Sequence, residues 1–240
     1  MSKKKYKPYK IKQGFVRRYV RKDIHPNFID LFEEIKSVGG IVCGGFARWA
    51  FSMRKDSSEP TDIDVYCRTK EIYDRLHSWF VSNDFKIKAE NELCVMYINP
   101  IVKYKILPPV QLIKPMKDAR IVTTGTVEEI LDSFDFTVCR CAITTPKTGI
   151  VDANYEHDEK NKILRIMNIH CPISSSIRFA KYYKKGYSVP PFEILKLFMD
   201  WDERTDEYRL NIIKFFQDLH DKRELSDQEI HEMERLMRID

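Results

Sequence analysis

Apolar and polar positions in the N-terminal third of the chain follow two different periods. Apolar residues recur at helical spacing over residues 28–38, which predicts an amphipathic helix that ends at Gly39 and Gly40. The apolar run at residues 41–43 predicts a strand, a second glycine pair opens a helix with the sequence FARWAFSM, and DIDVYC at residues 62–67 alternates as a half-buried strand does. The predicted order is strand, glycine turn, helix, loop and strand.

Towards the C-terminus the apolar positions keep the helical period. Residues 191–240 predict two or three helices, one of them capped by Thr205. The pattern as a whole predicts an α+β fold. The predicted strands precede the C-terminal helices along the chain.

Composition narrows the class of protein. The chain has 240 residues, 43% of them hydrophobic, which is enough to bury a core in one large domain or two small ones. No apolar run approaches the roughly 18 residues of a membrane span, and no apolar segment follows the N-terminal charges. We therefore expect a cytoplasmic protein without membrane contact. The six cysteines show no C-x-x-C pair and no zinc-type spacing, which favours reduced thiols over disulfides or structural zinc.

The net charge of +5 is unevenly distributed. Residues 1–22 hold ten Lys and Arg and no acidic residue, so the other 218 residues carry a net charge of −5. Four aromatic residues lie among these cations: Tyr6, Tyr9, Phe15 and Tyr19. A basic segment with interleaved aromatic residues is suited to contact phosphates and stack on unpaired bases, which predicts a nucleic-acid-binding arm. The alternative is a solvated terminus whose Phe15, Val16 and Val20 pack on the body of the protein.

Two carboxylates in the second predicted strand suggest a metal site. Side chains at i and i+2 of a strand point to the same face, so Asp62 and Asp64 project together. Two carboxylates this close repel each other and remain ionised at low cost only when a cation lies between them. Oxygen ligands in this arrangement suit Mg²⁺ or Mn²⁺.

The glycine turn before this strand is suited to bind phosphate. Gly44 and Gly45 let backbone N–H groups approach an anion, the helix N-terminus adds a favourable field, and Arg48 lies one turn into that helix. Taken alone, a G-G pair is usually a turn and a D-x-D is usually an exposed strand edge. Their combination, in this order and between apolar strands, favours a site for a triphosphate with a metal ion.

These residues resemble a known family. GGFAR followed by DIDVYC resembles the signature of the nucleotidyltransferase (DNA polymerase β-like) superfamily, and the arginine three residues after the second glycine is typical of its tRNA CCA-adding and bacterial poly(A) polymerase branch. Three later segments are similar to further motifs of that branch: DFTVCRCAI at residues 135–143, KTGIVDANYEHDEKNKILR at 147–165 and the neck-like IRFAKYYKKGYSV at 177–189. The resemblance covers roughly residues 38 to 190. It implies a nucleotidyltransferase head with a short mixed sheet and flanking helices over residues 23–172, followed by a small all-helical neck and cap over residues 173–240.

The resemblance also implies an activity. This is a template-independent, metal-dependent nucleotidyl transfer from ATP or CTP by a two-metal mechanism, with release of pyrophosphate. Asp62 and Asp64 would hold the metal ions, and Gly44, Gly45 and Arg48 would hold the triphosphate. The acceptor it implies is an RNA 3′ end, of tRNA or of another RNA, which the basic N-terminal segment is suited to contact.

Three more site residues depend on this resemblance. Asp135 either contacts the ribose or completes the metal cluster, and the sequence leaves both roles open. Thr137 shares its face if the segment is a strand, and it then either contacts the nucleotide or packs in the core. Gln111 stands where the family has a third acidic residue. As a neutral amide, it can orient a metal-bound water or a ribose hydroxyl without adding negative charge.

Other departures from the family concern the substrate. Ser133 and Phe134 stand in place of a pair of arginines, and about 50 residues follow the neck, which leaves no counterpart of the long helical body and tail that hold tRNA in the family. Four neck cations either contact RNA or form a solvated face: Arg178, Lys181, Lys184 and Lys185.

Two alternatives to an RNA-modifying enzyme follow from these departures. One is a nucleotidyltransferase that acts on a protein or a small molecule. The other is a catalytically inactive module that binds nucleotide or RNA and serves a regulatory role. No Ser, Cys or His lies in a setting typical of a nucleophile, so covalent catalysis is not indicated. The choice of nucleotide, the acceptor and the oligomeric state stay open.

Overall fold

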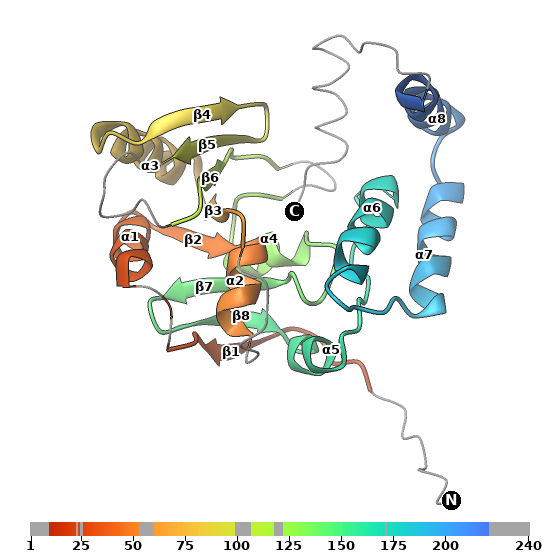
Figure 1. Ribbon diagram of the computed structural model, residues 1–240, viewed down its shortest axis with the longest axis horizontal. Helices are drawn as coiled ribbons and strands as arrows, with labels where there is room; N and C mark the ends of the chain where they lie inside the picture. The colour runs from red at the N-terminus through yellow and green to blue at the C-terminus, as the bar shows by residue number, and fades with distance from the viewer. Residues whose placement is uncertain are drawn as a thin grey trace, which may run out of the picture.

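The chain folds around one eight-stranded sheet (Figure 1) in a computed structural model that describes residues 10–22, 24, 26–52, 60–98, 107–117, 122–170 and 172–220. The strands are β1 Phe15–Tyr19, β2 Gly40–Cys43, β3 Ile63–Cys67, β4 Lys86–Glu90, β5 Cys94–Ile98, β6 Val110–Ile113, β7 Cys141–Thr145 and β8 Thr148–Asp152. The helices are α1 Pro26–Ser37, α2 Gly44–Phe51, α3 Lys70–Ser82, α4 Val127–Asp132, α5 Tyr155–Asn161, α6 Pro172–Tyr183, α7 Pro191–Asp202 and α8 Asp206–His220.

The sheet is mixed, as expected, with the strand order β1-β8-β7-β2-β3-β6-β5-β4. Only β3 and β6 run parallel, and every other neighbouring pair is antiparallel. The predicted order of strand, glycine turn, helix and strand is confirmed as β2, α2 and β3. Residues 53–59 of the predicted loop lie outside the described residues. The fold is α+β, as predicted.

Both faces of the sheet centre are covered. Val42 of β2 packs in a core with α1, α2 and α3, whereas its neighbours Ile41 and Cys43 pack in a second core with α4 and the segment after it. All five residues of β3 are buried for the same reason. The expectation of a half-buried strand at residues 62–67 is therefore wrong, because the sequence did not reveal that helices and loops cover the second face.

The predicted first helix is confirmed as α1, which buries Phe28, Leu31, Phe32 and Ile35. Five of the cysteines are buried thiols: Cys43, Cys67, Cys94, Cys139 and Cys141. Among the described helices, none is both long and apolar enough to cross a membrane.

The basic N-terminal segment contributes an edge strand. β1 pairs antiparallel with β8, from Phe15 opposite Asp152 to Tyr19 opposite Thr148. Phe15 and Val20 pack against the two cores, which confirms this part of the packing alternative, whereas Val16 is 49% exposed. The segment is thus part of the head from β1 onward, and residues 1–9 lie outside the described part of the chain.

The helices α6, α7 and α8 follow the head, and α6 packs against α7 (Figure 1). Thr205 accepts a hydrogen bond from the backbone N–H of Tyr208 at 3.2 Å, which confirms its predicted capping role at the start of α8. The rest of the predicted cap, residues 221–240, falls beyond the described ranges.

Candidate active site

The paired carboxylates lie at the centre of the sheet and line one pocket. Asp64 lies in β3 between Cys43 of β2 and Gln111 of β6, and it is buried. Asp62 immediately precedes β3 and is half-buried. Both residues line a pocket of about 250 Å³. The sequence therefore correctly predicted that these two side chains face the same space.

The first glycine of the turn is required by this arrangement. Gly44 has a φ of +65°, and a Cβ atom added to it would lie 2.4 Å from Asp64 Oδ2. Only glycine allows the backbone and the carboxylate to lie this close. Gly45 has no such restriction, because an added Cβ would meet nothing within 4 Å. Both glycines line the pocket and begin α2.

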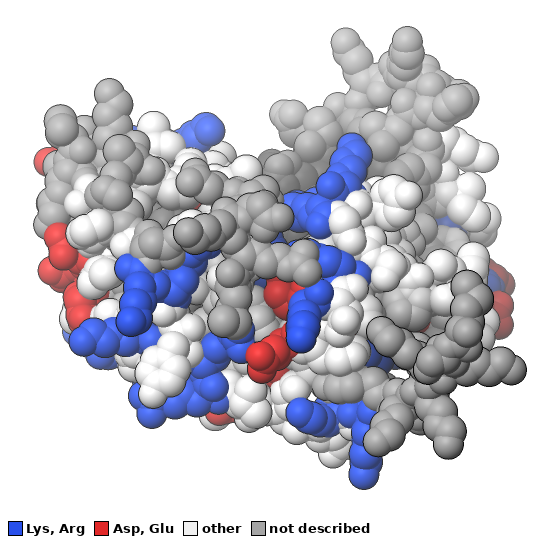
Figure 2. Space-filling model, turned by 60° about the horizontal axis from the view of Figure 1, so that its bottom comes forward, with Lys and Arg blue, Asp and Glu red and all other residues white. Residues whose placement is uncertain are grey.

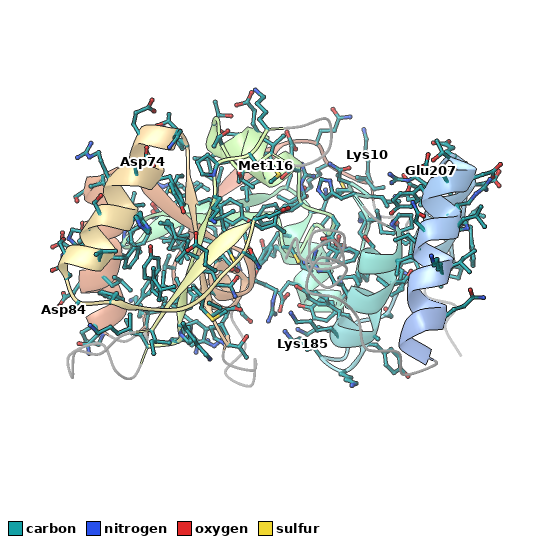
Figure 3. The ribbon with its side chains drawn as sticks, turned by 90° about the horizontal axis from the view of Figure 1, so that it is seen from above. Lys10, Asp74, Asp84, Met116, Lys185 and Glu207 are labelled. Carbon is teal, nitrogen blue, oxygen red and sulfur yellow. The ribbon has the colours of Figure 1, made fainter. Side chains whose placement is uncertain are left out.

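Basic side chains complete the lining of the pocket. Arg48 comes from α2, Arg178 and Lys181 come from α6, and Lys185 follows α6 on the neck side of the molecule (Figure 3). A space-filling view shows acidic side chains bordered by Lys and Arg on one face of the protein (Figure 2). A pocket with two carboxylates and four cations suits an anion that arrives with a divalent metal ion.

Arg48 is the strongest indication of an anionic ligand. Its side chain is only 4% exposed, and its Nη1 donates a hydrogen bond to the Tyr187 hydroxyl at 3.3 Å. Its Nε has no hydrogen-bond partner in the described part of the chain. A buried, charged donor without a partner is costly, so a phosphate oxygen in this pocket would satisfy it.

Gln111 lies where the resemblance placed it. It is opposite Asp64 in the parallel pairing of β3 with β6, and its Nε2 donates a hydrogen bond to Asp62 Oδ2 at 2.8 Å. The amide therefore orients one of the two carboxylates and adds no charge to the site.

Asp135 and Thr137 lie in the buried segment between α4 and β7. The segment is a bend and a turn rather than a strand, and neither residue lines the pocket. Asp135 is buried and accepts a hydrogen bond from Arg178 Nη1 at 2.6 Å. Thr137 is fully buried and donates to Asp158 Oδ2 at 2.8 Å. The described residues contain no group of three or more His, Cys, Asp or Glu side chains placed to share a metal ion. The structure thus does not bring Asp135 into a cluster with Asp62 and Asp64.

The pocket offers no thiolate nucleophile. Cys139 is the cysteine among the pocket-lining residues, and burial raises its pKa above the ordinary thiol value. Burial, with a further contribution from Asp64, also raises the pKa of Cys43. Both side chains are therefore neutral at physiological pH.

The arrangement of head and neck is shared with solved structures of CCA-adding enzymes. The enzyme of Thermotoga maritima in complex with tRNA is 16% identical and gives a TM-score of 0.52, over 73% of this chain and 43% of that one. CCA-adding enzymes in complex with CTP and with ATP are 18% and 17% identical, with TM-scores of 0.56 and 0.54 over 92% of this chain. This chain spans about half the length of these enzymes, 55% and 54% in the last two. At such identities the likeness establishes the fold: a nucleotidyltransferase-like head and neck.

A family model decides the identity. The model described as Gabija anti-defense 2 family protein matches residues 9–155, more than half of the chain. The chain belongs to the Gabija anti-defense 2 family. No curated protein matches it. The matched residues include the glycine turn and both pocket carboxylates, so this Gabija anti-defense 2 protein carries its candidate site largely inside the family region.

Sequence reasoning missed how the neck contributes to the site. Arg178, Lys181 and Lys185 were predicted to contact RNA or solvent, but they line the pocket of this family member. Their spacing of three and four residues, which places side chains on one helix face, was the signal that indicated a shared target. The ion pair of Arg178 with Asp135 holds this face against the head.

The role of Asp135 can be tested by Asp135→Asn. This change keeps the shape of the side chain but removes the charge of the carboxylate that is 2.6 Å from the buried Arg178 Nη1. We expect the free energy of unfolding to fall by about 2 kcal/mol, as measured by urea denaturation. Asp202→Asn is the control because Asp202 has a side chain that is 90% exposed, and we expect little change. A variant as stable as the parent protein would contradict a structural role of Asp135 in holding Arg178.

Proposed function

We propose that this protein is a metal-dependent nucleotidyltransferase that transfers a nucleoside monophosphate from ATP or CTP to an RNA 3′ end. The observation that carries the proposal is the pocket in which Asp62 and Asp64 lie with Arg48, whose buried Nε has no partner in the described residues. The CTP and ATP complexes of the CCA-adding enzymes support a nucleoside triphosphate as the donor, and the tRNA complex supports RNA as the acceptor. The family description supports a role in counteracting Gabija defence.

The residues present fit Mg²⁺ or Mn²⁺. Mg²⁺ in proteins is typically held by one or two carboxylates together with substrate phosphates, and Asp62 and Asp64 supply such a pair. The bound metal supplies the charge that lowers the pKa of the acceptor hydroxyl and stabilises the leaving pyrophosphate. The position of Gly44 against Asp64 keeps the phosphate-binding turn beside these carboxylates.

The other residues have distinct tasks in this mechanism. Arg48 donates to the phosphate chain through Nε, and Lys181 and Lys185 add positive charge from the neck. Gln111 holds Asp62 through its amide, which keeps the carboxylate in one orientation. In the transfer itself, the acceptor oxygen forms a bond to the α-phosphorus while the bond from that phosphorus to the bridging oxygen breaks, and pyrophosphate leaves with the electron pair.

The activity is tested by incubating the purified protein with each labelled nucleoside triphosphate, Mg²⁺ or Mn²⁺, and total RNA, and then separating RNA-linked, protein-linked and free label. The proposal expects label on RNA and release of pyrophosphate. Label on protein or on a small molecule would contradict RNA as the acceptor but would still support nucleotidyl transfer.

A second candidate function is a nucleotide-binding anti-defense protein without turnover. It is favoured by Gln111, a neutral amide beside Asp62 where the related family has an acidic residue. Measurable binding of ATP or CTP without incorporation into any acceptor and without pyrophosphate release would decide for this candidate.

The RNA acceptor leads to a prediction for β1. Lys12 and Arg17 are exposed in and beside this edge strand. Replacing both with glutamine should weaken RNA binding and reduce the slope of log affinity against log salt concentration by about 1.4. Fluorescence anisotropy with a labelled single-stranded RNA measures this slope. Because β1 is part of the sheet, these substitutions are a cleaner test than deletion of residues 1–22.

The matched control changes the opposite edge of the sheet. Lys86 and Lys88 are both exposed on β4, and their replacement with glutamine removes the same charge at a distance from β1. An equal loss in both double variants would show that only the net charge matters and would contradict a binding site on β1.

A further inference from the structure

The end of the Arg48 guanidinium opposite its unpartnered Nε is held by two residues from distant elements. Nη1 donates to the Tyr187 hydroxyl at 3.3 Å and lies 3.8 Å from Glu159 Oε1. Tyr187 in turn donates a short hydrogen bond to Glu159 Oε2. Glu159 comes from α5, and Tyr187 lies in the segment after α6, so the three side chains join α2, α5 and the neck.

The backbone of Arg48 is fixed as well. The Tyr155 hydroxyl, from the start of α5, donates to the Arg48 carbonyl oxygen at 2.9 Å. Tyr155 and Tyr187 are both buried, so these contacts are shielded from water. An arginine held at both its backbone and Nη1 has lost its rotamer freedom before a ligand arrives, and this lowers the entropic cost of binding.

The charge of this group favours an anion. Glu159 is shared by two cations, because Lys162 Nζ donates to its Oε1 at 3.0 Å and also to the Tyr187 hydroxyl at 3.3 Å. Burial raises the pKa of Tyr187, so the phenol stays neutral and adds no negative charge. Arg48, Lys162 and Glu159 together carry a net charge of +1. Because the group is largely buried, its attraction for an anion is stronger than it would be in water.

We propose that Glu159 and Tyr187 are positioning residues that hold Arg48 Nη1, so that Arg48 Nε is presented to the phosphate groups of the nucleotide. This inference rests on the proposed function, because it takes the pocket as the nucleotide site. In this arrangement the neck contributes to phosphate binding indirectly, because Tyr187 holds Arg48 and does not contact the phosphate itself.

The test measures binding of magnesium ATP to the full chain by isothermal titration calorimetry. Tyr187→Phe should weaken binding about fivefold and Glu159→Gln about tenfold, as expected for loss of a neutral and of a charge-assisted contact. Two controls keep the residue types at exposed positions nearby in the chain. They are Tyr183→Phe, at the end of α6, where the tyrosine is 75% exposed, and Glu156→Gln, on α5 like Glu159, with a side chain 73% exposed. Both controls should bind as the parent protein does.

A double-mutant cycle separates positioning from general structural support. If Tyr187 acts through Arg48, then Tyr187→Phe should change affinity by less than about twofold in an Arg48→Met background. Should that background not fold, Arg48→Gln serves in its place. The same fivefold loss in both backgrounds would overturn the inference, since Tyr187 would then act independently of Arg48.

The outcomes also distinguish this inference from the proposed function. Binding of ATP by the parent protein without pyrophosphate release would overturn nucleotidyl transfer and leave the positioning role standing, provided the cycle is non-additive. If the parent protein binds ATP and releases pyrophosphate, but the effects of Tyr187→Phe and Arg48→Met on affinity are additive, the positioning role alone is overturned. Failure of the parent protein to bind either ATP or inorganic triphosphate would overturn both.

Discussion

Replacing Asp64 with asparagine should reduce nucleotidyl transfer on the order of 1000-fold or more, because loss of metal-assisted charge stabilisation raises the barrier by several kcal/mol. Asp64 is 4% exposed and lies between β2 and β6 at the pocket, so an isosteric amide changes its charge with little change in packing. Asp62→Asn should give a loss of the same kind. The measurement is pyrophosphate release with each nucleoside triphosphate, alongside thermal unfolding to show that the fold persists.

Stability is part of this prediction. Removing one of two neighbouring carboxylates relieves their repulsion but also removes a counter-charge of the pocket cations, so we expect only a small change in unfolding temperature in the absence of metal. Asp74→Asn on α3 is the matched control, since its carboxylate is exposed and distant from the pocket-lining residues. If the double variant Asp62→Asn, Asp64→Asn released pyrophosphate at the parental rate, the assignment of the metal site would be wrong.

The second large effect is expected at the glycine turn. Gly44→Ala places a methyl group where Asp64 Oδ2 lies and forces a side chain into a left-handed backbone conformation, which costs about 1–2 kcal/mol by itself. The carboxylate must move to relieve the overlap, so we expect transfer to fall on the order of 100-fold. Kinetics and urea denaturation of the same preparation measure the two effects together.

Gly45→Ala is the matched control, one residue further into α2. Its added methyl group meets nothing within 4 Å, and alanine in a helix is favoured over glycine by about 0.5–1 kcal/mol. This variant should therefore be slightly more stable than the parent protein and leave Asp64 in place, so any loss of activity would report contact of the added methyl group with the phosphates. A Gly44→Ala protein with parental activity would show that the position of Asp64 does not matter for the chemistry.

Sequence reasoning predicted which residues come together in the pocket because their arrangement is largely local. Gly44 and Gly45 begin α2, Asp62 and Asp64 lie before and in β3, and the side-chain direction along a strand follows from the period of two. The family resemblance added Gln111, which lies opposite Asp64 as expected. The directions of Asp62 and Asp64 depend on short-range backbone geometry, whereas Gln111 lies beside them because β6 pairs with β3.

The failures share a cause in long-range contact. Asp135 was predicted to contact the ribose or to complete the metal cluster, and the sequence did not indicate its contact with Arg178, 43 residues later. Thr137 was predicted to contact the nucleotide or to pack in the core, and its contact with Asp158 was not indicated either. The basic segment was expected to be an arm, but β1 pairs with β8, more than a hundred residues along the chain. Apolar periodicity reports which face of an element is buried and carries no information about which distant element buries it.

The sequence by itself determined the order of the elements, the glycine turn and the paired carboxylates, since backbone preference and side-chain spacing act over a few residues. Only the tertiary structure shows that neck residues line the pocket and that Arg48 donates a hydrogen bond to Tyr187, 139 residues later in the chain. The packing of α6 and the following segment against the head brings these groups together, because a buried cation must find its partners wherever the folded chain places them.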